Sequence, residues 1–203
     1  MTSLLRHKTA HLATIMGLML VALPALAHVD ASHAVSSFGS GFLHPLTGLD
    51  HLLAMLAVGI WAAQHRRPFM WGLPLVFPMM MVLGASIGMS PEWNSGFSVE
   101  AGIAVSVSVL GLLIAFAVQL PLLASAVLVA LFALMHGYAH GVELPATASG
   151  MLYGTGFILS TALIHLCGFA GSVWMNKKIA TRAIRLTGAG IASIGLVFLV
   201  SLA

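Results

Sequence analysis

The chain has 203 residues, of which 60% are hydrophobic and only 6% are charged, and its formal net charge is +3. A soluble domain carries about 25% charged residues, so this composition excludes a water-soluble enzyme, an intrinsically disordered chain and a nucleic-acid-binding protein. It is the composition of an integral membrane protein. The single cysteine also excludes an internal disulfide and a zinc site built from cysteines.

Residues 1–27 have the features of a cleaved secretory signal peptide. A short basic segment precedes an apolar stretch, and small residues occupy the −3 and −1 positions before the expected cleavage after Ala27. An uncleaved signal anchor is the alternative. Cleavage leaves His28 as the new N-terminus and residues 28–203 as one transmembrane domain.

Six stretches after the signal are long and apolar enough to cross a membrane, where a helix needs about 20 residues. They lie near residues 45–64, 69–89, 98–118, 121–139, 149–173 and 183–202. The predicted fold class is therefore all-α, a polytopic membrane bundle of six transmembrane helices. The short connection between the third and fourth spans predicts an antiparallel hairpin.

The distribution of basic residues predicts how this bundle is oriented. Arg66 and Arg67 follow the first span, and four more basic residues lie between the fifth and sixth spans, whereas the loops after the second and fourth spans contain no Lys or Arg. Basic loops stay in the cytoplasm, so the first span is expected to run inward. This places both mature termini in the periplasm of a bacterial cell and the protein in its inner membrane.

Ten histidines stand against five acidic residues, although ionisable side chains are costly in hydrocarbon. The first histidine motif opens the first span and runs from His44 to His51. Pro45 suits the first helical turn, which makes His44 the predicted N-cap. On a continuous helix His44 and His51 share one face. Asp50 points away from that face, about 9 Å into the helix, either as a partner that orients an imidazole or as a ligand.

The second histidine motif ends the fourth span. His136, His140 and Glu143 are spaced i, i+4 and i+7, so one helix face presents all three if the helix continues through Glu143. Two imidazoles one turn apart are a common chelate for a divalent transition metal, and a carboxylate adds charge balance. If Gly141 ends the helix instead, Glu143 lies in a mouth loop and captures the ion there.

The predicted orientation brings both motifs to the outer surface at the same membrane depth. The result is an outer-mouth site of four histidines with Asp and Glu, which suits Ni²⁺, Co²⁺ or Zn²⁺ better than Cu(I). Glu100, at the start of the third span, either lines the same vestibule or lies among the lipid headgroups. A polar network that only fixes helix packing is the alternative, but it requires two matching motifs at one depth without a ligand.

Three other positions enlarge the set of candidate metal ligands. His28 and His33 would form a chelating tail outside the membrane, although short polar tails often contain histidine. His165, about 15 residues into the fifth span, is either a hydrogen-bonded packing residue or a second station on a transport path. His65, beside the basic pair, is expected to be a solvated loop residue.

Both motifs resemble those of the HupE/UreJ family, and the resemblance covers essentially the whole mature chain. The matching residues are His44-Pro45, Gly48, Asp50-His51, Met55, Val58-Gly59, Trp61-Ala62-Ala63, Phe132-Ala133-Leu134, His136-Gly137, Ala139-His140-Gly141 and Glu143. The resemblance implies a bacterial inner-membrane permease that supplies nickel, or cobalt in some members, for hydrogenase or urease maturation. The functional positions it implies are His44, Asp50, His51, His136, His140 and Glu143.

The leading hypothesis is thus a permease and not an enzyme, with a divalent metal ion and the lipid bilayer as its partners and no nucleic acid. The sequence contains no P-loop motif for ATP, so facilitated diffusion driven by the membrane potential is the simplest energetics. One alternative is an intramembrane zinc hydrolase in which Asp50 or Glu143 is the general base. Another is haem held by two histidines, for which a Soret band would be diagnostic.

Overall fold

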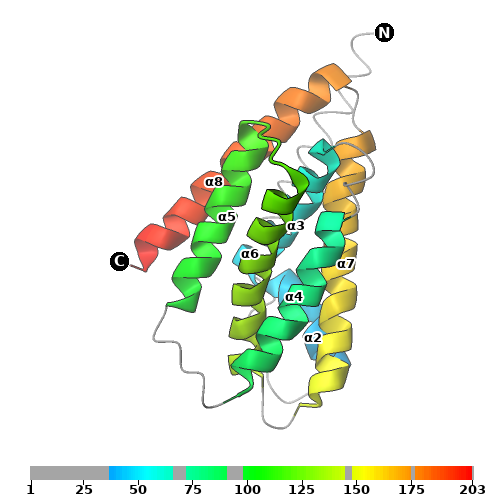
Figure 1. Cartoon of the computed structure of the whole chain (residues 1–203), viewed down its shortest axis with the longest axis vertical. Coiled ribbons are helices and arrows are strands. Elements are labelled where there is room, and N and C mark those ends of the chain that lie inside the picture. Colours follow the sequence, from blue (N-terminus) through cyan, green and yellow to red (C-terminus); the bar gives the residue numbers. More distant parts are fainter. Residues whose placement is uncertain (1–36, 66–71, 91–97, 145–147, 175–176, 203) are drawn as a thin grey trace. The chain divides into compact units, whose positions relative to one another are not determined.

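The computed structural model describes residues 37–65, 72–90, 98–144, 148–174 and 177–202, all of which belong to one compact unit, Ser36–Ala203. Every regular element in these described segments is an α-helix (Figure 1), which confirms the all-α prediction. The helices are α2 (Ser37–Thr47), α3 (Leu49–Gln64), α4 (Gly72–Gly88), α5 (Val99–Ala115), α6 (Leu122–Val142), α7 (Gly150–Trp174) and α8 (Lys177–Ser201). The expected signal peptide and the tail with His28 and His33 lie outside the described residues.

Three of these helices are long and apolar enough to cross a membrane: α6, α7 and the Thr181–Ser201 part of α8. Helices α2 and α3 pass the same test only as a bent pair, and α4 and α5 are apolar but have 17 residues each. The described residues therefore contain three candidate spans, or four if the bent pair is one span. The protein is a multi-pass membrane protein.

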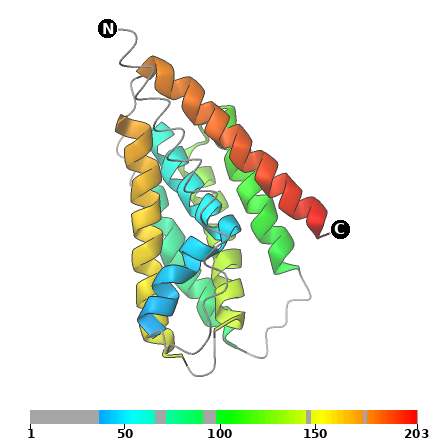
Figure 2. The same cartoon turned by 180° about the vertical axis from the view of Figure 1, so that it is seen from behind.

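The prediction of one helix over residues 45–64 is wrong, because the chain breaks at Gly48. Helices α2 and α3 meet there at 79°, and Gly48 has extended backbone angles, as Figure 2 shows for the two blue and cyan helices. His44 and Pro45 consequently lie in the last turn of α2, and His44 is not an N-cap. The Thr47 hydroxyl and the Gly48 N–H both donate to the His44 carbonyl oxygen, which closes α2 before the bend.

Helices α4 and α6 pack chiefly on each other, and α5 packs chiefly on α8. The predicted hairpin partners α5 and α6 are consecutive in the chain but are not each other's main neighbours. Gly137 and Gly141 of α6 lie against the backbone of Met81 and Ala85, so closely that any side chain at the two glycines would collide. Each glycine directly follows a histidine of α6, so these histidines lie beside the contact between the two backbones, about 100° around the helix from it.

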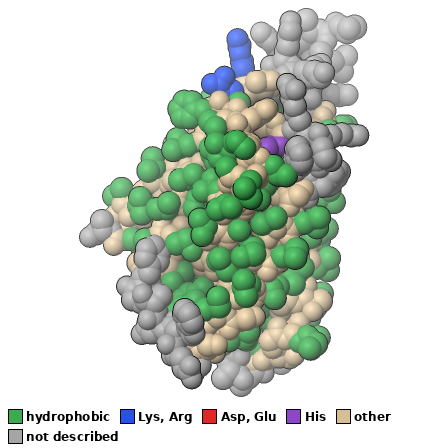
Figure 3. Space-filling model, viewed as in Figure 1, with side chains coloured by type: hydrophobic (Ala, Val, Ile, Leu, Met, Phe, Trp, Pro, Cys, Tyr) green, Lys and Arg blue, Asp and Glu red, His purple; other side chains and the backbone are tan. Residues whose placement is uncertain are grey.

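The outer surface of the bundle is largely apolar. Figure 3 shows hydrophobic side chains over most of the visible face, with Lys and Arg only at the end where α8 begins. There Arg185 donates a hydrogen bond of 2.7 Å to the carbonyl oxygen of Ala115, the last residue of α5. The end of α3 lies there too, since the Gln64 amide donates to the carbonyl oxygen of Ile114. We call this the basic end.

Candidate metal site

Four imidazole rings from α2, α3 and α6 lie in contact at the end opposite the basic end. His140 is central, with its ring centroid 4.7 Å from that of His44 and 4.5 Å from that of His51. The His136 ring lies 5.1 Å from the His51 ring, and His44 and His51 are 6.0 Å apart. We call these residues the four-histidine cluster. The structure thus brings together the two predicted motifs, but His44 arrives through the bend at Gly48 and not along one helix face.

Asp50 holds the His51 ring in place. Its Oδ1 atom accepts from the His51 backbone N–H at 2.8 Å and from the His51 ring Nδ1 at 2.7 Å. Asp50 lies in the first turn of α3, so the expected depth of about 9 Å is wrong, and the helix N-terminus favours its negative charge. Gly48 leaves the room this pair needs, because a Cβ atom there would lie 3.1 Å from both Asp50 Oδ1 and His51 Nδ1.

Two rings of the cluster have one nitrogen anchored and the other unpaired. The His136 ring donates from Nδ1 to the Phe132 carbonyl oxygen at 2.9 Å, and His51 uses Nδ1 on Asp50. Since each acceptor is an oxygen without a proton, Nδ1 carries the hydrogen and Nε2 keeps a lone pair. Both Nε2 atoms are buried without a hydrogen-bond partner among the described residues. This is how proteins orient histidines that bind metals.

His140 has neither ring nitrogen paired within the described structure, although it is only 5% exposed. Its neighbours are the rings of His44, His51 and Phe157, the last at 4.2 Å between centroids. A buried polar group without a partner is costly, and a network that only fixed helix packing would pair these nitrogens. The unpaired lone pairs therefore argue against the packing alternative.

Glu143 stands at the entrance to the cluster. Helix α6 continues through Val142 and Glu143 caps it with helical angles, so Gly141 does not end the helix. The Glu143 side chain is 59% exposed, and its Oε2 atom lies 3.9 Å from His44 Nε2. Ligand atoms of His44, His140 and Glu143 all lie within 4.8 Å of one another, which is close enough to share an ion.

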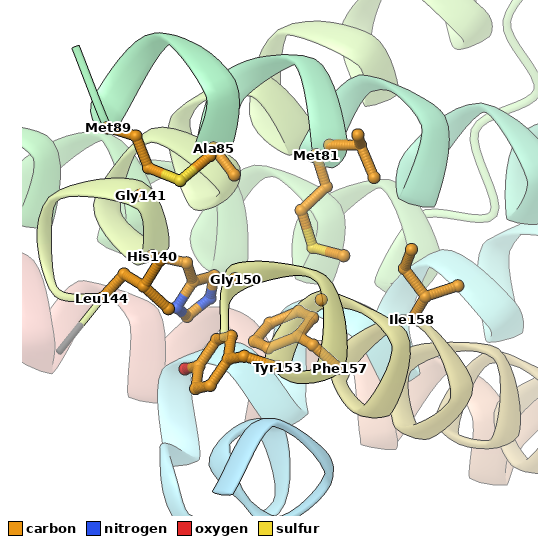
Figure 4. Close-up of a pocket in the computed structure, with 12 residues that line it drawn as sticks. Met81, Ala85, Met89, His140, Gly141, Leu144, Gly150, Tyr153, Phe157 and Ile158 are labelled. Carbon is orange, nitrogen blue, oxygen red and sulfur yellow. The ribbon is translucent and has the colours of Figure 1, made fainter. Parts of the chain in front are cut away.

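A cavity with apolar walls adjoins His140 between α4, α6 and α7. Met81 and Met89 of α4 face Tyr153 and Phe157 of α7 across it, and the His140 imidazole reaches its edge (Figure 4). No sequence pattern singled out Tyr153 or Phe157, because their only signal is contact with residues far away in the chain. Their rings close one side of the four-histidine cluster, since the centroids of both lie 6.0 Å from that of the His44 ring.

The remaining predicted residues lie apart from the cluster. Glu100 is exposed in the first turn of α5 and pairs with the Ser98 hydroxyl at 3.3 Å. The expectation for His65 is wrong: it caps α3, and its ring bonds both the Trp61 carbonyl oxygen and the Ser125 hydroxyl. His165 is buried deeper in the bundle at 2% exposure.

Comparisons with known proteins agree with the motifs. The family model described as HupE / UreJ protein matches residues 16–198. Protein HupE of Rhizobium leguminosarum bv. viciae is 36% identical over 180 residues, which cover 89% of this chain and 93% of that protein. No solved structure matches the chain. The predicted resemblance is therefore confirmed, and the chain belongs to the HupE/UreJ family.

Proposed function

We propose that this protein is an inner-membrane permease that imports Ni²⁺, with Co²⁺ as the next candidate, for the maturation of hydrogenase or urease. The observation that carries the proposal is the convergence of unpaired, buried imidazole nitrogens at one end of an apolar helix bundle. Membership of the HupE/UreJ family, a family of accessory metal transporters, supports the same conclusion.

The donor set fits a divalent first-row metal ion. Neutral imidazole nitrogens suit Ni²⁺, Co²⁺ and Zn²⁺, and the carboxylates of Asp50 and Glu143 together balance the charge of one divalent ion. Glu143 and His44 meet the ion first, and His140, His51 and His136 bind it further in. The tail with His28 and His33, outside the described residues, would collect the ion before it reaches this entrance.

Six spans remain the best interpretation of the bundle. Helices α4 and α5 have 17 residues, which is the lower limit for crossing the hydrocarbon core. Each lies beside a longer apolar helix, α6 and α8 respectively. With the bent pair α2–α3 as the first span and a cleaved signal peptide, the basic end is cytoplasmic and both mature termini are periplasmic.

The membrane potential is sufficient to drive import through such a permease. An inside-negative potential favours cation entry by about 2.3 kcal/mol per charge per 100 mV. A divalent ion therefore gains about twice that amount. The carboxylates stand at helix ends near the entrance, so they attract the ion at the start of the path and do not trap it in the middle.

The hydrolase alternative is not favoured. A metallohydrolase needs an open metal position beside a free general base. Asp50 is instead engaged by two donors of His51, and Glu143 is exposed at the entrance. The centroids of neighbouring imidazole rings are also only 4.5–6.0 Å apart, which is too close for the plane of a haem between two of them.

Uptake of radioactive nickel tests the proposal. Cells that express the wild-type protein should accumulate more nickel than cells without it, and His51→Ala should lower this uptake by about 10–100-fold. His65→Ala is the matched control, because it removes an imidazole of the same helix whose nitrogens are both paired. If His51→Ala accumulates as much nickel as the wild type at equal membrane abundance, the permease proposal fails. Competition by excess Co²⁺, Zn²⁺ or Mg²⁺ in the same assay identifies the preferred ion.

A further inference from the structure

His165 of α7 is a buried histidine outside the four-histidine cluster. It is 2% exposed, and neither of its ring nitrogens has a hydrogen-bond partner of ordinary geometry among the described residues. The ring thus lacks a well-formed hydrogen bond, as that of His140 does, and the Pro74 backbone is its one polar neighbour recorded among the described residues. Such a histidine is costly to bury, so a packing role alone does not account for it.

The position of His165 along the bundle is defined by Gly59 of α3. The Gly59 backbone lies directly against the His165 backbone, where any side chain would collide. Gly59 is ten residues beyond Leu49, the start of α3, and at 1.5 Å per residue this is about 15 Å along the helix axis. His165 thus lies at a different level from His51 and nearer the basic end.

One aromatic ring, that of Phe77, links the cluster to His165. The centroid of the fully buried Phe77 ring is 5.6 Å from that of His136 and 5.2 Å from that of His165. Phe77 therefore contacts both His136, the most deeply buried imidazole of the cluster, and His165. An ion that leaves His136 has one ring to pass before it reaches another imidazole.

Neutral oxygen atoms are available near His165. Pro78 of α4 has no N–H group, so it leaves the carbonyl oxygen of Pro74, four residues earlier, without its helical hydrogen bond. The Pro74 backbone interacts with the His165 ring. Thr161 lies one turn before His165 on α7 and is fully buried, and within the described structure its hydroxyl donates to the Met55 sulfur alone, at 3.4 Å.

We propose that His165 is a second, weaker binding site for the transported divalent transition-metal ion, reached from the four-histidine cluster by displacement of the Phe77 ring. The ligands are one imidazole nitrogen with the neutral oxygens of Pro74 and Thr161. The described acidic residues Asp50, Glu100 and Glu143 all stand at helix ends elsewhere, so this site does not balance the charge of the ion. Weak binding is what a transport path requires at an inner station, because the ion must leave again.

The inference rests on the proposed function, and its test separates transport from capture at the cluster. Nickel uptake by cells is measured for His165→Gln, which fills the space without an imidazole, and for His165→Cys, which restores a metal ligand. Nickel binding to each purified protein is measured by equilibrium dialysis at ion concentrations low enough to fill only the stronger site. Ser160→Ala is the matched control, because Ser160 is a buried residue of α7 whose hydroxyl also lacks a partner among the described residues.

We expect His165→Gln to lower uptake by about tenfold or more, because loss of even a partner that orients a ligand costs about 10–100-fold, and to leave high-affinity binding unchanged. His165→Cys should recover most of the uptake, and Ser160→Ala should match the wild type. Wild-type uptake by His165→Gln overturns the inference, and so does a His165→Cys protein that is as inactive as His165→Gln, since imidazole would then serve packing alone. In either case, the permease proposal still stands if His51→Ala loses uptake. If the wild-type protein takes up no nickel, both the permease proposal and the inference about His165 fail.

Discussion

Helix α3 carries a histidine at each end, and the two are used in opposite ways. At its start, the His51 ring is hydrogen-bonded to Asp50 through Nδ1, while Nε2 stays unpaired and the His136 and His140 rings are its neighbours. At its end, both nitrogens of the His65 ring are hydrogen-bonded, one to the Trp61 carbonyl oxygen at 2.9 Å and one to the Ser125 hydroxyl at 3.1 Å. The residue type is the same, so the pairing of the nitrogens distinguishes an imidazole prepared for an ion from one that joins helices.

The surroundings of the two ends follow the same division. Around His65 the Trp61 indole donates to the Val118 carbonyl oxygen, and Gln119 donates to the Gln64 carbonyl oxygen. These bonds tie the turn between α5 and α6 to the end of α3. Around His51 no comparable network satisfies the free nitrogens within the described residues. The basic end is thus built for stability, and the four-histidine cluster gives up stability for binding.

Replacement of His140 should break this comparison most strongly. His140→Leu removes two unpaired nitrogens from a buried position, so the free energy of unfolding should stay the same or rise, while nickel uptake falls by about 100-fold. Thermal unfolding in detergent and radioactive uptake at equal abundance give the two measurements. A variant that is clearly less stable than the wild type would show that the His140 nitrogens are paired in the working protein.

The charge of Asp50 comes next. Asp50→Asn keeps an oxygen that can accept from the His51 ring but removes one of the two carboxylate charges beside the cluster. We expect the affinity of the purified protein for nickel to fall by about tenfold, the lower end for loss of a partner that orients a ligand. Equilibrium dialysis measures the affinity directly. Equal affinity in the two proteins would mean that Asp50 contributes orientation alone.

The parts of this comparison that could be predicted from the sequence are the local ones. His136, His140 and Glu143 belong to one helix, and helical periodicity alone aligns them. To predict that the two motifs meet at one end of the bundle, only the directions of the first and fourth spans were needed. Helix positions from α4 to α8 also follow from apolar length, because a membrane leaves few other solutions.

The parts that could not be predicted depend on contacts between distant residues. Pro45 is compatible with the start of a helix or with its last turn, and α2 lies where it does because Gly41 and Gly156 let α2 and α7 touch through their backbones. The partner of His65, Ser125, is 60 residues away, so proximity to two arginines suggested solvent instead. Phe77 likewise has no local signal for its place between two imidazoles.

Acidic solution should separate the two ends without a mutation. Metal ions bind only unprotonated imidazole, whose ordinary pKa is about 6.5. Burial disfavours a charged ring, so protons compete with the ion for the free nitrogens of the cluster only at a pH below this value, and uptake should fall severalfold as the external pH drops from about 6 to about 4. His65→Ala should show the same pH profile as the wild type. Uptake that is constant down to about pH 4 would count against histidine ligands.

The smallest effect on transport is expected at the basic end. His65→Ala removes two hydrogen bonds between α3 and its surroundings, each of which contributes about 1 kcal/mol, so the free energy of unfolding should fall by about 1–2 kcal/mol and the unfolding temperature by a few degrees. Nickel affinity should not change, because His65 lies at the opposite end of α3 from His51. Uptake per molecule in the membrane should therefore match the wild type. If His65→Ala instead loses nickel affinity at full stability, both ends of α3 belong to the metal path and the division between them is wrong.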